Sequence, residues 1–152
     1  MPNWCENDVT ICHSDPAAIT RVRDAFKDGR LCREFIPTAD GEWNYDFTVA
    51  NWGTKWDVGG DVIDETGDEI VLSFQSAWSP PTKLYDKLVE LGYEVKAFYW
   101  EPGMAYAGLY EEGTDDCYDY GGMSADKIAA HLPQDLDDCY QISEFVREYE
   151  EE

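Results

Sequence analysis

The order in which strand-like and helix-like segments follow one another constrains the fold of this chain more than any other feature. Residues 7–13 place Val9 and Ile11 on one side of an extended segment, which is typical of a half-buried strand. The alternate positions are polar: Asp8, Thr10 and Cys12. Residues 14–29 begin with an Asp-Pro capping signal and repeat apolar residues on one face until Gly29, so they predict a helix.

The middle of the chain repeats this succession. Two strand-like runs, residues 54–64 and 69–78, flank a Glu-Thr-Gly-Asp connection with the length and composition of a hairpin. Residues 79–92 begin with Ser-Pro-Pro and carry a stripe of leucines that stops at a glycine, which predicts a second helix. Two further strands are predicted at residues 94–100 and 105–110.

The predicted order is therefore strand, helix, strand, strand, helix and strand, with one added strand. Residues 31–37 and 40–48 show no clean period, and we expect them to be irregular. The order predicts an α+β fold for residues 1–110. It is typical of a ferredoxin-like split βαβ sandwich, in which an antiparallel sheet carries two helices on one face.

The C-terminal part has a different character. An acidic segment punctuated by glycines follows Tyr110, and helical patterns then occupy residues 124–132 and 135–149. We expect residues 111–149 to form an acidic loop and a helical extension packed on the first domain. The last residues, 150–152, are predicted to be a free tail.

The charge is strongly unbalanced, with 33 Asp and Glu against 11 Lys and Arg in 152 residues and a formal net charge of -22. Residues 1–110 hold 19 acids and 9 bases, whereas residues 111–152 hold 14 acids and 2 bases. This charge repels phosphate backbones and anionic membranes, so we expect no direct contact with nucleic acid or membrane. A soluble small domain needs a net charge of only about 2 to 8 in magnitude, so the excess calls for another explanation.

The sequence favours a protein without catalytic activity, cofactor or metal. His13 and His131 are the only histidines, and the five cysteines are scattered without a Cys-x-x-Cys pair. We expect Cys5, Cys12 and Cys139 to be structural thiols in apolar surroundings. No phosphate-binding glycine loop or hydrolase motif occurs, and the acids after Tyr110 miss the spacing of a calcium loop. The first residues lack a secretion signal, which predicts a cytoplasmic protein.

Four patches of the sequence carry a resemblance to a known family. They are Pro-Asn-Trp-Cys-Glu-Asn at 2–7, Asn-Trp-Gly-Thr-Lys-Trp-Asp at 51–57, Ala-Trp-Ser-Pro-Pro at 77–81, and residues 99–108. In this order they resemble the YubB ferredoxin-like proteins of phages and plasmids, over roughly residues 1–110. The resemblance implies a ferredoxin-like fold and an origin in a mobile element, and it implies no catalytic residues. The acidic region that follows departs from the shared pattern.

Charge and resemblance together suggest a function. Carboxylates held on a folded body present an array that resembles nucleic-acid phosphates to a groove rich in Lys and Arg. We therefore expect a nucleic-acid mimic that inhibits a DNA- or RNA-binding defence complex of the host, of the anti-CRISPR or anti-restriction type. The expected partner-binding residues are Glu111, Glu112, Asp115, Asp116, Asp119, Asp135, Asp137, Asp138, Glu144 and Glu148.

Three alternatives stay open at the level of the sequence. An enzyme is one of them, and it requires His13 or His131 in a cleft beside two carboxylates or a bound metal. The acidic surface can serve solubility alone. The motif Trp52–Asp57 can also form a small-ligand or homo-oligomeric binding site, homodimer included, with two indoles as platforms and with Lys55 and Asp57 as polar anchors. Large indoles beside a glycine more often complete a core, with Lys55 over an aromatic face, so the motif favours a structural role.

Overall fold

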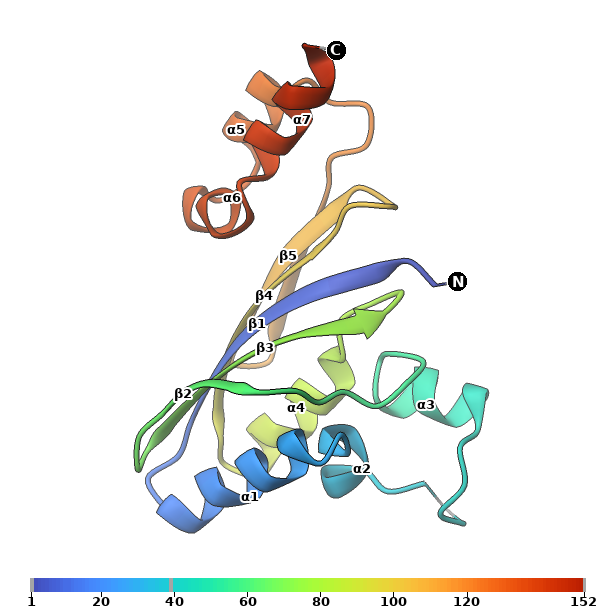
Figure 1. Cartoon of the computed structure of the whole chain (residues 1–152), viewed down its shortest axis with the longest axis vertical. Coiled ribbons are helices and arrows are strands. Elements are labelled where there is room, and N and C mark those ends of the chain that lie inside the picture. Colours follow the sequence, from blue (N-terminus) through green and yellow to red (C-terminus); the bar gives the residue numbers. More distant parts are fainter. Residues whose placement is uncertain (1, 39, 152) are drawn as a thin grey trace.

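The computed structural model describes residues 2–38 and 40–151 and shows an α+β fold built on a six-stranded antiparallel sheet. The order across the sheet is β2-β3-β1-β4-β5-β6, so the first strand lies in the middle (Figure 1). The strands are β1 (Trp4–Cys12), β2 (Val62–Glu65), β3 (Glu69–Ala77), β4 (Glu94–Glu101), β5 (Tyr106–Glu111) and β6 (Thr114–Asp119).

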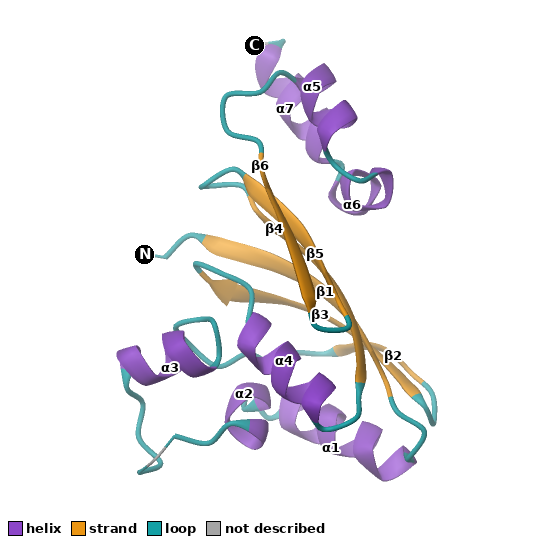
Figure 2. Cartoon of the chain, turned by 180° about the vertical axis from the view of Figure 1, so that it is seen from behind, coloured by secondary structure: helices purple, strands orange, loops and turns teal. Residues whose placement is uncertain are grey.

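Helices cover both faces of this sheet, at different places. One group lies below the sheet in Figure 1, and the C-terminal group lies on the other side, near the ends of β4, β5 and β6 (Figures 1 and 2). The first group is α1 (Pro16–Lys27), α2 (Leu31–Phe35), α3 (Tyr45–Asn51) and α4 (Thr82–Glu90). The second is α5 (Ala125–His131), α6 (Gln134–Tyr140) and α7 (Ile142–Glu150). No helix of the described part of the chain has the length and apolar character that crossing a membrane requires.

Each face of the sheet has its own core. Val9 and Ile11 of β1 are buried against α1 and α4, as their alternation predicts. Strand β4 contributes to both cores, because Val95 points to the first one while Trp100 packs in the second with the C-terminal helices. The period of two therefore separates the side chains of one strand between two layers of helices.

The predicted helices and strands of the first domain form, except for most of the strand predicted over residues 54–64, and two helices are added. Residues 31–37 and 40–48, expected to be irregular, contain α2 and the first part of α3. The Asn44 side chain caps α3 by accepting from the amide of Phe47. The cap of α2 comes from far along the chain, since the Asp57 carboxylate accepts from the amides of Cys32 and Arg33.

The strand predicted over residues 54–64 forms only at its end, as β2. The preceding residues are tied to the end of α1 instead: Gly60 donates to the carbonyl of Phe26, and Leu31 donates to that of Val58. Gly59 runs so close to this turn that an added Cβ would lie 2.5 Å from the Cα of Gly29. Residues 58–60 are therefore bonded to the end of α1 and the start of α2, and they do not pair with a strand of the sheet.

The acidic loop expected after Tyr110 is instead a strand, β6, paired along its length with β5. The helix predicted over residues 135–149 is two helices, because Gln141 adopts a left-handed conformation with a φ of 54° between α6 and α7. Glu150, expected in a free tail, ends α7 and accepts from the amide of Ala125. Glu152 lies outside the described residues.

Gly108 of β5 provides a test of this packing. An added Cβ would overlap the ring of Tyr99 and lie 2.7 Å from the carbonyl oxygen of Asp116. We expect Gly108→Ala to lower the free energy of unfolding by about 2 kcal/mol, measured by urea denaturation. Gly67→Ala is the matched control, since nothing lies within 4 Å of its added Cβ, and it should change stability by less than about 0.5 kcal/mol. Equal effects of the two variants would contradict the close packing of Gly108 against Tyr99.

Candidate functional site

Two of the predicted partner-binding acids lie at the turn between β5 and β6. Glu111 ends β5 and is exposed. Glu112 adopts a positive φ of 50°, and its carboxylate accepts from the amide of Val95 at 2.9 Å. These two carboxylates therefore lie at the end of β6 that is remote from the C-terminal helices.

The three predicted acids of β6 point to both faces of the sheet. Asp115 shares a face with Tyr99, whose hydroxyl donates to its carboxylate at 2.6 Å. Burial raises the pKa of Asp115 above its usual value, and the hydrogen bond from Tyr99 acts in the opposite direction. Asp116 lies on the other face, opposite Leu109, and Asp119 accepts from the amide of Gly121 in the turn after the strand.

The predicted acids of the helices differ in exposure. Those on the surface are Asp135, Asp138, Glu144 and Glu148. Asp137 is only 6% exposed, and it accepts from both the amide and the hydroxyl of Ser143, at 2.8 and 2.7 Å. This carboxylate fastens the start of α7 to the end of α6. Asp137 therefore belongs to the fold and not to a binding surface.

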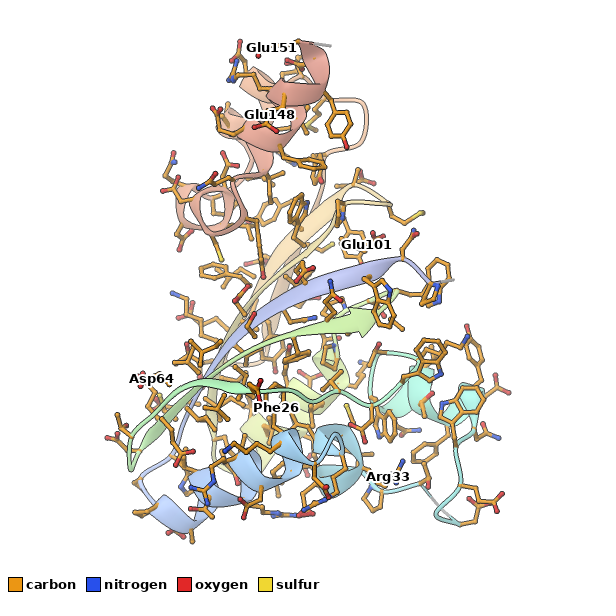
Figure 3. The ribbon with its side chains drawn as sticks, in the orientation of Figure 1. Phe26, Arg33, Asp64, Glu101, Glu148 and Glu151 are labelled. Atoms are coloured by element: carbon orange, nitrogen blue, oxygen red, sulfur yellow. The ribbon has the colours of Figure 1, made fainter. Side chains whose placement is uncertain are left out.

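The ten predicted acids do not form one continuous surface. Strand β6 runs from the turn near α4 to the C-terminal helices (Figure 2), and its six residues span about 20 Å. Glu148 lies on the C-terminal helices (Figure 3), whereas Glu111 and Glu112 lie at the opposite end of β6. The array expected from sequence is thus divided into separate groups.

A second group of acids shares one face of the sheet. The side chains that alternate with the first core point to the face opposite α1 and α4, and this face is rich in carboxylates. Asp64 lies there, on the other side of β2 from Phe26 of α1 (Figure 3). We name this group the acidic sheet face: Glu6, Asp8, Asp64, Glu69, Glu94, Glu111 and Asp116.

Basic residues neutralise little of the negative charge on the acidic sheet face. Lys96 of β4 is the one Lys or Arg within the described strands. Ion pairs within 4 Å occur in the described chain, but none of them includes a carboxylate of this face; the acids they use are Asp24, Asp28, Glu34, Glu65, Glu90, Asp126 and Glu144. The face therefore carries seven acids against one base on a hydrogen-bonded sheet.

An open groove crosses one end of this face. It has a volume of about 470 Å³ and is lined by Thr10, Cys12 and Glu94, with Lys96 and Glu111 beside them. A neighbouring hollow of about 310 Å³ shares Cys12 and Glu94 and adds residues of the adjoining loops. In the described ranges, 2–38 and 40–151, no group of three His, Cys, Asp or Glu side chains is arranged to hold a metal ion.

The acidic sheet face was missed by reasoning from sequence, except at Glu111 and Asp116. Its signal was present in the polar positions of residues 7–13, where Asp8 alternates with the buried Val9. A single strand pattern does not reveal which polar residues of distant strands share a row. The register supplies this information, since it places Cys12 between Glu69 and Glu94.

The motif Trp52–Asp57 is divided between the core and the surface. Trp52 is 1% exposed and donates to the carbonyl of Ile36, and Asp57 caps α2. Trp56 is 39% exposed, and the ammonium group of Lys55 lies 4.6 Å from the centre of its ring, as predicted for a lysine over an aromatic face. The two polar anchors therefore do not converge on one ligand site.

The cysteines show no activated thiol. Cys5 is buried, and burial raises its pKa to about 12, with the charge of Glu101 adding to the effect. Cys139, expected in apolar surroundings, is exposed on α6, and partial burial with the charges of Asp8 and Asp135 raises its pKa to about 11. Cys12 is half-buried, with a raised pKa. These thiols remain protonated near neutral pH.

Comparisons with known proteins add little to this geometry. No family model matches the sequence, and no curated protein matches it. A solved structure, described as protein api92 from Yersinia pseudotuberculosis with the family model DUF1281, is 22% identical with a TM-score of 0.43. The similarity covers 61% of this chain and 40% of that chain, so this chain spans less than half of that protein.

The structural role of Asp137 can be tested by substitution. Asp137→Ala removes the acceptor for two donors at the junction of α6 and α7, so we expect the free energy of unfolding to fall by about 2 kcal/mol in urea denaturation. The control is Asp138→Ala, which removes an exposed carboxylate bonded to Gln134 and should cost about 0.5 kcal/mol or less. A larger loss for Asp138 than for Asp137 would show that the junction is held in another way.

The thiol pKa values predict slow alkylation of the folded protein. Labelling of Cys139 by iodoacetamide should increase as the pH approaches about 11, because only the thiolate reacts. In urea all five cysteines should follow the ordinary pKa of about 8.5. Mass spectrometry after timed labelling identifies the sites. Rapid labelling of one cysteine in the folded protein at neutral pH would contradict the absence of an activated thiol.

Proposed function

We propose that this protein is a non-enzymatic nucleic-acid mimic whose acidic sheet face binds the basic surface of a host DNA- or RNA-binding protein. The observation that carries the proposal is the collection of seven carboxylates and one base on a single sheet face. A groove made of Lys and Arg gains free energy when it releases counterions from DNA. A fixed array of carboxylates can bind such a groove with the same gain in free energy, although it carries no nucleotide bases.

The rigidity of the array supports this function. Glu6 and Asp8 lie on β1, which is hydrogen-bonded to a neighbour on each side, so their backbone is fixed before any partner binds. Side chains on such a strand lose less entropy on binding than a flexible acidic tail does. Carboxylates that gather on neighbouring strands repel one another and destabilise the fold. A selective advantage in binding accounts for their being kept there.

The fold assignment that belongs to this proposal is ferredoxin-like. The strand order β2-β3-β1-β4, with α1 and α4 as the two helical connections, supports a split βαβ sandwich. Strands β5 and β6 then extend the sheet, and the C-terminal helices cover the end of the face that such sandwiches leave open. The acidic extension is thus proposed as an addition to this sandwich, over residues 111–149.

The setting that we propose is a phage or another mobile element, and the partner is a CRISPR complex or a restriction enzyme in the host cytoplasm. The tryptophan-centred patches that resemble the YubB proteins support this setting. A protein that blocks a nucleic-acid-binding defence gives such an element an advantage. The exposed acids Asp135 and Asp138 belong to α6, which packs on β4 and β5, and we propose that they enlarge the contact.

Charge neutralisation tests the proposal. The variant Asp8→Asn, Asp64→Asn, Glu69→Gln and Glu94→Gln removes four charges with almost no change in shape. Host nucleic-acid-binding proteins, enriched on heparin, are captured on the immobilised wild-type protein and on the variant. We expect the wild type to retain a protein that elutes with salt and with added duplex DNA. The variant should bind it about tenfold or more weakly and with a smaller salt dependence.

A matched control removes the same charge from the helical side of the molecule: Asp28→Asn, Glu42→Gln, Asp46→Asn and Glu90→Gln, all exposed. This variant should bind almost as well as the wild type. Equal losses of affinity in the two variants would show that binding depends on the net charge of the protein and not on the acidic sheet face. Binding that resists both salt and competing DNA would exclude mimicry.

A further inference from the structure

Four of the six tryptophans of the chain remain on the surface. Their exposed fractions are 40% for Trp4, 51% for Trp43, 39% for Trp56 and 45% for Trp78. Burying an indole contributes more to stability than burying almost any other side chain, so a surface that keeps several of them marks an interaction site. The acidic sheet face does not explain why these tryptophans are exposed, because an uncharged indole adds nothing to the negative charge that a basic partner would bind.

These tryptophans come from separate segments that meet at one end of the sheet. Trp4 begins β1 opposite the end of β3, where the amide of Trp78 donates to the carbonyl of Asn3 at 2.8 Å. The ring of Trp56 lies 6.1 Å from that of Trp4, and the Trp43 indole donates to the carbonyl of Lys55. Figure 1 shows this end, where the N-terminus, the tip of β3 and α3 are neighbours. We name the four residues the indole cluster.

The backbone holds Trp78 in an unfavourable conformation. Its φ of 71° lies in the left-handed region, which bulky side chains rarely adopt. The hydroxyl of Tyr106 donates to the carbonyl of Trp78 at 2.7 Å, and the amide of Trp78 donates to the carbonyl of Asn3. The fold thus tolerates backbone strain at a residue whose side chain gains little from burial. Such strain concentrates at functional positions.

The chemistry of the cluster favours a cation. The face of an indole is the negative end of its quadrupole and attracts ammonium and guanidinium groups. The chain already shows this, because the Lys55 ammonium lies over Trp56. The net charge of -22 attracts cationic partners to the same surface and repels the phosphates of a single-stranded nucleic acid, which also stacks on indoles.

The position of the cluster connects it with the acidic sheet face. The alternation of β1 places Trp4 on the same side of the strand as Glu6 and Asp8. A basic surface seated on these carboxylates therefore reaches Trp4 at its edge. Arginine suits both parts, because its planar guanidinium stacks on aromatic rings and also pairs with carboxylates.

We infer that the indole cluster is the docking site for an arginine-bearing segment of the basic partner, which stacks guanidinium groups on Trp4, Trp56 and Trp78. This inference rests on the proposed function, because the occupant is part of the same partner. The indoles supply a contribution to affinity that depends little on salt, and the acidic sheet face supplies the contribution that depends on salt.

Two basic peptides of equal length and charge serve as probes: one alternates Arg with Gly, and the other alternates Lys with Gly. We expect the Arg peptide to bind the full chain about fivefold more tightly than the Lys peptide. It should also shift the indole N–H signals of Trp4, Trp56 and Trp78 in NMR spectra. The indole N–H of the buried Trp52 donates to Ile36 and should not shift.

Substitutions separate the two contributions. Trp4→Leu with Trp56→Leu should weaken binding of the Arg peptide about tenfold, remove the preference over Lys, and leave the salt dependence unchanged. Tyr149→Leu is the matched control, a 63% exposed aromatic residue of α7, and should have no effect. Lys55→Gln frees the face of Trp56 and should strengthen binding more than Lys27→Gln, which removes the same charge from α1. Circular dichroism checks that each variant is folded.

The outcomes distinguish this inference from the proposed function. Equal affinity for the two peptides, lowered only when the acidic sheet face is neutralised, would overturn the inference and leave the proposed function standing. Loss of binding in the tryptophan variant alone, with the neutralised acidic face behaving as wild type, would sink the proposed function and retain the indole site. A single-stranded oligonucleotide that binds the cluster more tightly than the Arg peptide would overturn the assignment of the occupant.

Discussion

Strand β1 is hydrogen-bonded along both of its edges, to β3 and to β4, and the arrangement of both faces of the sheet follows from this pairing. A buried polar residue helps to fix its register. The Asn7 amide donates to Ser76 of β3 at 2.8 Å, and the Tyr85 hydroxyl of α4 donates back to Asn7 at 3.2 Å. A slip by one residue would bury Asp8 and expose Val9, which a buried core does not permit.

The sheet supports two cores because its strands alternate fully. The first core lies beneath β1 and β3 with α1 and α4, and the second lies above β4 and β5 with the C-terminal helices. Beside the second core, the carboxylates of Glu6, Asp8 and Glu69 on β1 and β3 remain partly exposed. Tyr140 of α6 marks the border, since its hydroxyl donates to the carbonyl of Phe98 on β4 at 2.9 Å and lies 3.5 Å from the carbonyl of Glu6 on β1. The C-terminal helices therefore reach the edge of the acidic sheet face at Glu6 and leave Asp64 and Glu94 exposed.

Elements with local signals were predictable from the sequence, and those fixed by distant contacts were not. Helix α1 carries its own cap at Asp15 and its own apolar stripe, so it was foreseen. Helix α2 depends on Asp57, which lies 25 residues from the Cys32 amide that it binds. The acids of β6 disfavour a strand, and only pairing with β5 makes one. The acidic sheet face could not be predicted for the same reason, because only the pairing of β1 with β3 and β4 places Glu69 and Glu94 on either side of Cys12.

The placement of the few bases strengthens the case for a binding surface. Arg21, Arg23 and Arg30 pair with acids on the helical side of the sheet, and Arg147 pairs with acids of the C-terminal helices. Such exposed pairs contribute little to stability one by one, but they neutralise the field around each helix. On the acidic sheet face this neutralisation is missing, and Lys96 alone stands among seven carboxylates. The carboxylates of the acidic sheet face therefore have no ion-pair partner in the described part of the chain, and the proposed contact with a basic surface would supply one.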